Sequence, residues 1–209
     1  MSTMIKVDRE PRRFLAQRAI GSGFQSVLFA DCYSAEEARE CVRIVRPETP
    51  QDGGAYGAAL RRFAYTYAGG PESYSTCGGS AAYADVLRDV VVAVMIEKRS
   101  AVDNLAEILS VQGVDMIQWG PADYAMSIGK PGARSDPQVK EAERYVIKTA
   151  LDMGVVPRVE IGSVEQAARY LDMGVRHFSI GVDLMILFKW LKEKGENLRH
   201  VMENGGEKE

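Results

Sequence analysis

The segment "NLAEILSVQGVDMIQWG" (104–120) shows the pattern that decides the fold: an amphipathic helix, a glycine, and a short apolar strand. The same order recurs in "FLAQRAIGSGFQSVLFA" (14–30), "VIKTALDMGVVPRVEI" (146–161) and "AARYLDMGVRHFSIG" (167–181). Each glycine stands where a helix ends and a residue that tolerates a positive φ is favoured. This repeat is typical of parallel βα proteins, whose strands are covered on both faces.

The apolar runs predict six strands, near residues 4–7, 26–30, 90–97, 114–119, 155–161 and 175–181. Helix starts are predicted by capping-box spacing at 34–37 and 163–166, by a similar pattern from Ser100 to Asp103, and by a Ser or Asp cap before proline at 135–138. Six βα units are two short of a complete (β/α)₈ barrel. We expect one domain over residues 1–209.

Composition excludes several classes of protein. A net charge of -3 gives no reason to expect a nucleic acid or an anionic membrane as partner. The three cysteines fit neither a disulfide framework nor a CxxC metal site, so reduced thiols are expected. The N-terminus lacks the apolar core of a signal peptide, and no run approaches the roughly 20 apolar residues of a membrane span. These features predict a soluble, cytoplasmic protein.

Two segments break the repeat. Residues 47–80 are rich in Gly, Pro, Ser and Tyr, and only "GAALRRFAYTY" within them has the character of a short helix. A long irregular segment of this kind is typical of a functional loop or of a mobile insertion, so we interpret 47–80 as a rim loop or insertion. Residues 203–209 are polar and are expected to form a flexible tail.

Carboxylates follow the predicted strands, where parallel α/β proteins collect their active sites. They are Asp31, Glu97, Asp123, Glu160 and Asp183. Glu97 and Asp123 follow consecutive strands, which lie only about 5 Å apart, so both could bind one Mg²⁺ or Mn²⁺. The alternative is that they cap helices or pair with a cation such as Lys98 or Arg99, beside Glu97.

The turn "GPAD" (120–123) also has two interpretations. Gly120 has no Cβ, so its backbone can approach a ligand closely, and neighbouring N–H groups can bind a carboxylate. Pro121 fixes the turn and removes one donor. An ordinary turn that ends a strand explains the same residues equally well.

The segment "MIEKRSAVDNLAEILSVQGVDMIQWGPADYAMSIGKPG" (95–132) resembles the part of the HpcH/HpaI aldolase/citrate lyase family that carries its metal site. The likeness extends over about 5–190 and is most specific at "IE-x-R", "GVD", "GP-x-D" and "IG-x-D". It implies a TIM-type (β/α)₈ barrel of the phosphoenolpyruvate/pyruvate superfamily, with about six units present. It also implies Glu97 and Asp123 as ligands of Mg²⁺, Mn²⁺ or Co²⁺, and a substrate-binding turn made of Gly120, Pro121, Ala122 and Asp123.

The activity that the resemblance implies is that of a class II, metal-dependent aldolase. Such a lyase cleaves or forms 4-hydroxy-2-oxo acids through a pyruvate enolate, with a 2-oxo acid and an aldehyde as reactants. Lys6 takes the place of the family's enolate-stabilising arginine, and Arg9 is the competing candidate. The family's first two βα units and their histidine have no counterpart here. Of the two histidines, His177 lies inside a predicted strand and is either a candidate base or a core or rim residue, and His200 is expected to be solvated.

The resemblance further implies a homo-oligomer, because family members often exchange a terminal helix between subunits. The predicted helix 183–202 has an apolar stripe, and the alternative is that this stripe packs on its own barrel. Two other functions remain open. One is a non-catalytic or truncated member that retains metal and 2-oxo-acid binding. The other is a citrate-lyase-type enzyme acting on an acyl-CoA.

Overall fold

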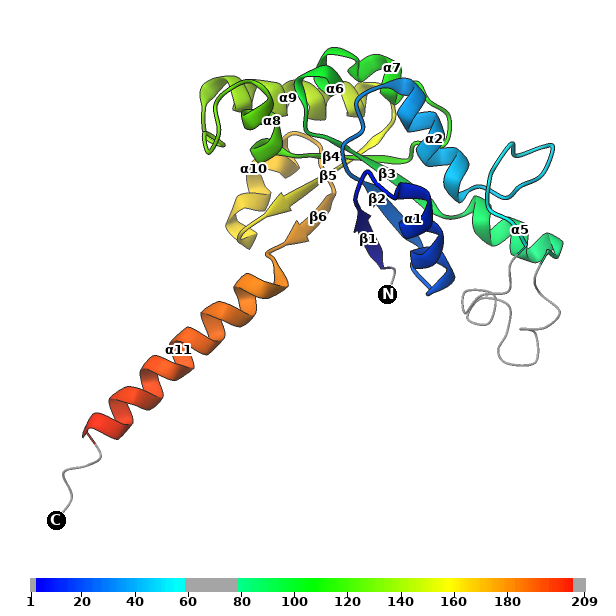
Figure 1. The fold of residues 1–209 in the computed structure, drawn as a ribbon. Helices are drawn as coiled ribbons and strands as arrows, with labels where there is room; N and C mark the ends of the chain where they lie inside the picture. Colours follow the sequence, from blue (N-terminus) through cyan, green and yellow to red (C-terminus); the bar gives the residue numbers. More distant parts are fainter. Residues whose placement is uncertain (1–2, 59–78, 205–209) are drawn as a thin grey trace.

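The computed structural model describes residues 3–58 and 79–204, and within these ranges it forms one parallel sheet. The six strands lie in sequence order, and each pairs with the next in parallel (Figure 1). They are β1 (Met4–Val7), β2 (Ser26–Phe29), β3 (Val91–Ile96), β4 (Met116–Trp119), β5 (Val156–Ile161) and β6 (His177–Ile180). All six predicted strands are therefore confirmed, in an open, curled sheet.

The connections between strands are helical, as the repeat predicts. The helices of the described residues are α1 (Arg12–Gly21), α2 (Ala35–Val45), α5 (Ala81–Arg88), α6 (Arg99–Asp103), α7 (Leu105–Leu109), α8 (Pro121–Ser127), α9 (Pro137–Asp152), the 3₁₀ helix η2 (Val164–Gln166), α10 (Ala167–Asp172) and α11 (Asp183–Asn204). The glycines expected at helix ends all have positive φ: Gly23, Gly113, Gly154 and Gly174.

Two of the predicted helix starts are confirmed. The Ser34 hydroxyl accepts a hydrogen bond from the Glu37 N–H at 3.3 Å, and the Asp136 carboxylate accepts one from the Gln138 N–H at 2.9 Å. In each case a side-chain oxygen satisfies an N–H group that the helix itself cannot bond.

At the other two predicted starts a helix begins at or next to the predicted residue, but the expected capping hydrogen bond is absent. The helix near Ser100 begins at Arg99, and Lys98 precedes it without a capping hydrogen bond. η2 begins directly after Ser163, but the Ser163 side chain forms no capping hydrogen bond; the Gln166 side chain accepts a hydrogen bond from the Gly162 N–H at 3.0 Å.

Alternation along the strands divides the core into two layers. Side chains such as Phe29, Val94 and Ile117 point to the helical side and form the main core with α1, α2, α7 and α9. The intervening Leu28, Ala93 and Met95 form a small cluster on the opposite face of the sheet. The central strands β2, β3 and β4 are thus covered on both faces, and they hold the carboxyl ends of the sheet in fixed positions.

Part of the segment 47–80 is described, up to residue 58 and from residue 79. Ala55 and Tyr56 are buried, and the Arg13 and Gln17 side chains of α1 both donate hydrogen bonds to the Ala55 carbonyl, at 3.0 and 2.9 Å. This part packs on the helical layer, beside the carboxyl end of α2. Residues 59–78 of the predicted rim loop and 205–209 of the predicted tail lie outside the described residues.

The C-terminal helix α11 differs from the others. It extends away from the sheet (Figure 1), and none of its residues is buried. The alternative that its apolar stripe packs on its own barrel is therefore wrong for the described chain. The described residues include no helix that is long and apolar enough to cross a membrane.

Candidate active site

A cleft of about 800 Å³ opens at the carboxyl ends of the strands. The topology explains its position, because parallel strands in sequential order bring all their carboxyl ends to one edge. Every residue of the turn Gly120 to Asp123 lines it, as do Glu97 from the end of β3 and Lys6 from β1. The structure therefore places together the predicted metal ligands, the predicted carboxylate-binding turn and one of the two predicted cations.

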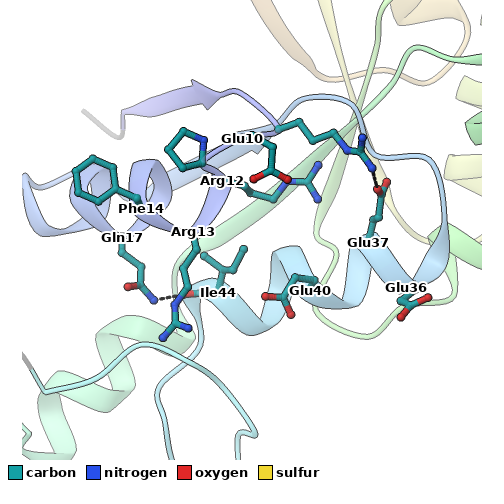
Figure 2. A pocket seen from close by; sticks show the side chains of 11 residues that line it. Glu10, Arg12, Arg13, Phe14, Gln17, Glu36, Glu37, Glu40 and Ile44 are labelled. Atoms are coloured by element: carbon teal, nitrogen blue, oxygen red, sulfur yellow. Dashed lines mark hydrogen bonds and ion pairs between the residues drawn. The ribbon is translucent and has the colours of Figure 1, made fainter.

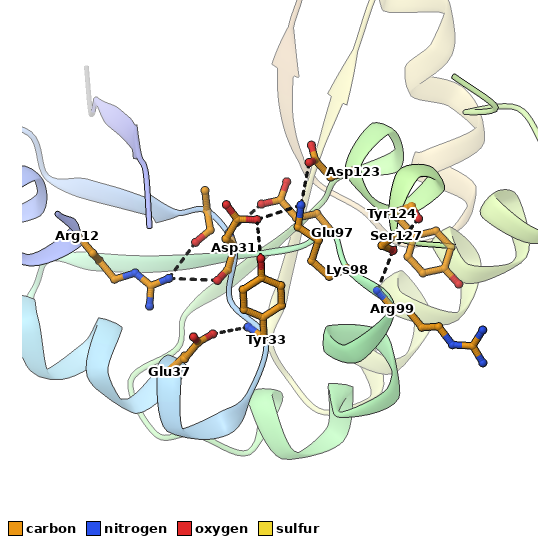
Figure 3. Close-up of polar contacts among 11 residues, drawn as sticks. Arg12, Asp31, Tyr33, Glu37, Glu97, Lys98, Arg99, Asp123, Tyr124 and Ser127 are labelled. Atoms are coloured by element: carbon orange, nitrogen blue, oxygen red, sulfur yellow. Dashed lines mark hydrogen bonds and ion pairs between the residues drawn. The ribbon is translucent and has the colours of Figure 1, made fainter. Parts of the chain in front are cut away.

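Glu97 is the most buried carboxylate of this cleft, with only 2% of its surface exposed. Its Oε1 accepts a hydrogen bond from the Asp31 N–H at 2.8 Å (Figure 3). Burial raises the pKa of Glu97, and the Asp31 N–H and the charge of Lys6 oppose this effect. No Lys or Arg of the described residues forms an ion pair with Glu97, so this buried carboxylate would gain from a nearby cation.

Asp123 lies in the first turn of α8 and is half exposed. Its Oδ1 is 2.8 Å from Nζ of Lys98, which also lies 3.1 Å from Oδ1 of Asp31 (Figure 3). Burial works against the charged form of Lys98, but the two carboxylates outweigh it and raise the pKa of Lys98. Lys98 therefore pairs with Asp123 and Asp31. The alternative that a strand-end carboxylate pairs with a neighbouring cation is confirmed for Asp123 and is wrong for Glu97.

Gly120 is required at its position by the closeness of Glu97. A Cβ on Gly120 would lie 2.5 Å from the Glu97 Cβ and 2.8 Å from Glu97 Oε2, which is closer than real side-chain contacts. Pro121 occupies the first position of α8, directly after Gly120. The first N–H groups of a helix have no acceptor within it, so this turn offers donors to an anion beside Glu97.

These residues fit a hard divalent cation. Glu97 and Asp123 supply carboxylate oxygens, which Mg²⁺ and Mn²⁺ prefer. Within 3–58 and 79–204 there is no cluster of three or more His, Cys, Asp or Glu side chains suited to a metal. Two protein ligands would leave coordination positions for water and for substrate oxygens.

The two predicted catalytic cations are separated by the structure. Lys6 lines the cleft, and its charge acts on Glu97. Arg9 forms an ion pair with Glu37 and lies over the ring of Tyr33, 4.8 Å from its centroid. It lines another pocket, of about 700 Å³, between α1 and α2 (Figure 2).

Neither histidine reaches the cleft. His177 begins β6 and is therefore at the amino end of the sheet, and His200 lies on the exposed face of α11, hydrogen-bonded to Asn204. Among the strand-end carboxylates, Glu160 lines the cleft and Asp183 does not.

Sequence reasoning missed the basic side chains of the cleft wall. Arg134, Lys140, Arg169 and Lys189 come from four separate segments and gather with Lys6 around the cleft. They form no cluster in the sequence, so only the fold reveals them. Five basic side chains stand against four acidic ones, before any cation is added, which favours an anionic ligand.

Comparisons with known proteins identify the family of this chain. A model of the HpcH/HpaI aldolase/citrate lyase family matches residues 1–189. The 4-hydroxy-2-oxo-heptane-1,7-dioate aldolase of Escherichia coli is 34% identical over 166 residues, which is 79% of this chain and 59% of that protein. The hydroxypyruvate/pyruvate aldolase of Delftia acidovorans is 30% identical over 173 residues, 83% of this chain and 60% of that protein.

Among solved structures, an HpcH/HpaI aldolase/citrate lyase family protein from Burkholderia cenocepacia is similar with a TM-score of 0.78 and 26% identity. The alignment covers 94% of this chain and 73% of that one. The chain spans about three fifths of the length of the curated relatives that it matches. On the extent of these matches, the chain belongs to the HpcH/HpaI aldolase/citrate lyase family.

Proposed function

We propose that this chain acts in a divalent-metal-dependent aldolase that cleaves or forms 4-hydroxy-2-oxo acids through a pyruvate enolate. The observation that carries the proposal is the buried Glu97, which has no ion-pair partner among the described residues and lies against Gly120 beside Asp123. The names of the relatives support the reaction class, since both are aldolases of 2-oxo acids.

In this proposal Glu97 and Asp123 hold the cation, which can be Mg²⁺, Mn²⁺ or Co²⁺. When bound, the cation supplies Lewis acidity that polarises the 2-oxo group of the substrate and favours enolate formation. The burial of Glu97 excludes water from one side of the site, which strengthens its attraction for a cation.

The chain's other residues bind and orient the 2-oxo acid. The N–H groups of the turn at Ala122 and Asp123 bind the substrate carboxylate, because they lack acceptors within α8. Lys6 stabilises the negative charge of the enolate from β1, as a point charge without the fork of an arginine. The aldehyde occupies the outer cleft, whose basic wall favours an anionic compound.

The same proposal includes a homo-oligomer. Helix α11 exposes Leu184, Leu187, Phe188, Trp190 and Leu191 by more than half of each side chain. An apolar stripe of this kind is typical of a surface that another chain covers. The cleft is partly lined by Met185, Ile186 and Lys189 of this helix, so its position bears on the site.

The proposal is tested by the exchange of pyruvate methyl protons in D₂O, followed by NMR with Mg²⁺ or Mn²⁺. Exchange measures enolate formation and does not require the aldehyde to be known. We expect metal-dependent exchange that falls at least about a hundredfold in Glu97→Gln and in Asp123→Asn, which is the size of effect expected when a charged group that stabilises the enolate is lost. Exchange that survives in both variants would contradict the site.

A further inference from the structure

Lys98 lies where it can compete with the proposed cation. Its Nζ is 2.8 Å from Oδ1 of Asp123 and 3.1 Å from Oδ1 of Asp31, and 21% of its side chain is exposed. Asp123 is one of the two proposed metal ligands, and the other, Glu97, directly precedes Lys98 in the chain. The ammonium group thus binds a carboxylate that a divalent ion would also use (Figure 3).

Asp31 is held firmly as the second partner of Lys98. It has a φ of 51°, a left-handed conformation that is uncommon for residues other than glycine. The Arg12 guanidinium donates to the carbonyls of Ala30 and Asp31, at 3.1 and 3.2 Å, and the Asp31 N–H donates to Glu97. The Tyr33 hydroxyl lies 3.4 Å from Asp31 Oδ1. The Arg12 and Glu97 contacts hold the backbone at Asp31, and the Tyr33 hydroxyl contacts its carboxylate, which lies within reach of Lys98.

We propose that Lys98 is an internal counter-cation that occupies Asp123 in the metal-free protein and is transferred to Asp31 when a divalent ion binds. Competition by Lys98 then lowers the affinity of the site for the metal. Asp31 reduces the free energy needed to move the Lys98 ammonium away from Asp123. This inference rests on the cation site of the proposed function, and it adds two positioning residues that do not themselves bind the metal.

Electrostatics gives the direction of the effect. An ammonium group a few ångströms from a divalent ion repels it, and the ion must also compete for the Asp123 oxygen. Removing the Lys98 charge should therefore strengthen metal binding. Removing the Asp31 charge should weaken it, because the displaced ammonium would lose its second partner.

The test is titration of the full chain with Mn²⁺, followed by electron paramagnetic resonance and calorimetry. In Lys98→Met the alkyl stem is retained without the charge, and we expect Kd to fall at least about fivefold. Lys148→Met is the matched control, since Lys148 is an exposed lysine paired with Asp152 on α9, and its Kd should equal that of the parent protein. Lys98→Gln serves if Lys98→Met does not fold.

A double-mutant cycle isolates the role of Asp31. Asp31→Asn should raise Kd when Lys98 is present and should have a clearly smaller effect in the Lys98→Met background. An equal effect in both backgrounds would overturn the transfer of Lys98 to Asp31, because Asp31 would then act on the metal directly.

Glu97→Gln separates failure of this inference from failure of the proposed site. If Mn²⁺ binds, is lost in Glu97→Gln, and binds equally in the parent and Lys98→Met, the metal site stands and the competition by Lys98 is overturned. If neither the parent nor Lys98→Met binds Mn²⁺, both the proposed metal site and the competition by Lys98 are overturned. An effect of Lys98→Met that persists in Glu97→Gln also overturns the inference, since the ion would then bind elsewhere.

Discussion

Strands β3 and β6 are predicted by the same sequence pattern, yet they differ in burial. From Val92 to Ile96 every residue of β3 is buried, whereas no residue of β6 is. β3 pairs with β2 and β4, and helices cover it, while β6 has β5 as its one partner among the described strands and leads into the uncovered helix α11. The difference shows that the sequence pattern of a segment predicts a strand. Whether the strand is buried depends on which other elements pack on it, and its own sequence does not specify them.

The largest effect is expected when one phenylalanine is truncated in each of two regions, the buried central strands and the exposed helix α11. Phe29 in β2 is fully buried, so Phe29→Ala should lower the free energy of unfolding by about 3–5 kcal/mol. Phe188 on α11 is 57% exposed, so Phe188→Ala should change it by less than about 0.5 kcal/mol. Urea unfolding measures both, at protein concentrations low enough to keep the chain monomeric.

A concentration dependence would sharpen this comparison. If another copy of the chain covers α11, Phe188→Ala should become destabilising as the protein concentration rises, while the effect of Phe29→Ala stays constant. A large effect of Phe188→Ala in dilute protein would instead show that α11 packs on its own sheet, contrary to the structure.

The next prediction compares two glycines. Gly120→Ala places a Cβ 2.5 Å from the Glu97 Cβ, so it should cost about 1–3 kcal/mol and weaken Mn²⁺ binding. Gly195 lies inside α11 with nothing within 4 Å of its added Cβ, so Gly195→Ala should favour the helix by about 0.5–1 kcal/mol. Chemical unfolding measures the first change and circular dichroism the second. Opposite signs are expected, and equal signs would contradict the assigned surroundings.

These contrasts also show which parts of the fold and of the candidate site can be predicted from the sequence. The strands and the glycines at helix ends are predicted because their causes are local: apolar runs, and a backbone conformation that favours glycine. The resemblance predicts that Glu97, Asp123 and Gly120 are site residues. Their position in one cleft follows from the order of the strands in the sheet. The pairing of Lys98 with Asp31 is not predictable, because it joins loops after β2 and β3 that are separated in the chain by α2, the whole segment 47–80, α5 and β3.

The two Ser-x-x-Glu/Gln patterns make the same point on a smaller scale. The spacing is alike at Ser34 and Ser163, but only Ser34 accepts a hydrogen bond from a helix N–H. Ser34→Ala should therefore cost about 1 kcal/mol, and Ser163→Ala should cost a few tenths at most. Thermal unfolding of both variants at one pH tests this. Equal losses would mean that Ser163 caps its helix in solution.

The smallest effect we expect lies within the buried region and depends on pH. Burial raises the pKa of Glu97, while the Asp31 N–H and Lys6 partly offset that rise. The folded chain therefore binds the Glu97 proton more tightly than the unfolded chain. Stability falls as pH rises from the ordinary pKa of a glutamate through the raised value, and it stays lower above that value.

Glu97→Gln removes this penalty because glutamine does not ionise. In metal-free protein, Glu97→Gln should thus be more stable than the parent at neutral pH, and the difference should vanish below the ordinary pKa of glutamate, about 4.3. Unfolding curves across that range, with excess chelator, measure it. Mn²⁺ should reverse the order by stabilising only the parent. A parent chain that is already the more stable without metal would mean that Glu97 has a cationic partner in solution, and the central reason for placing a metal beside it would be lost.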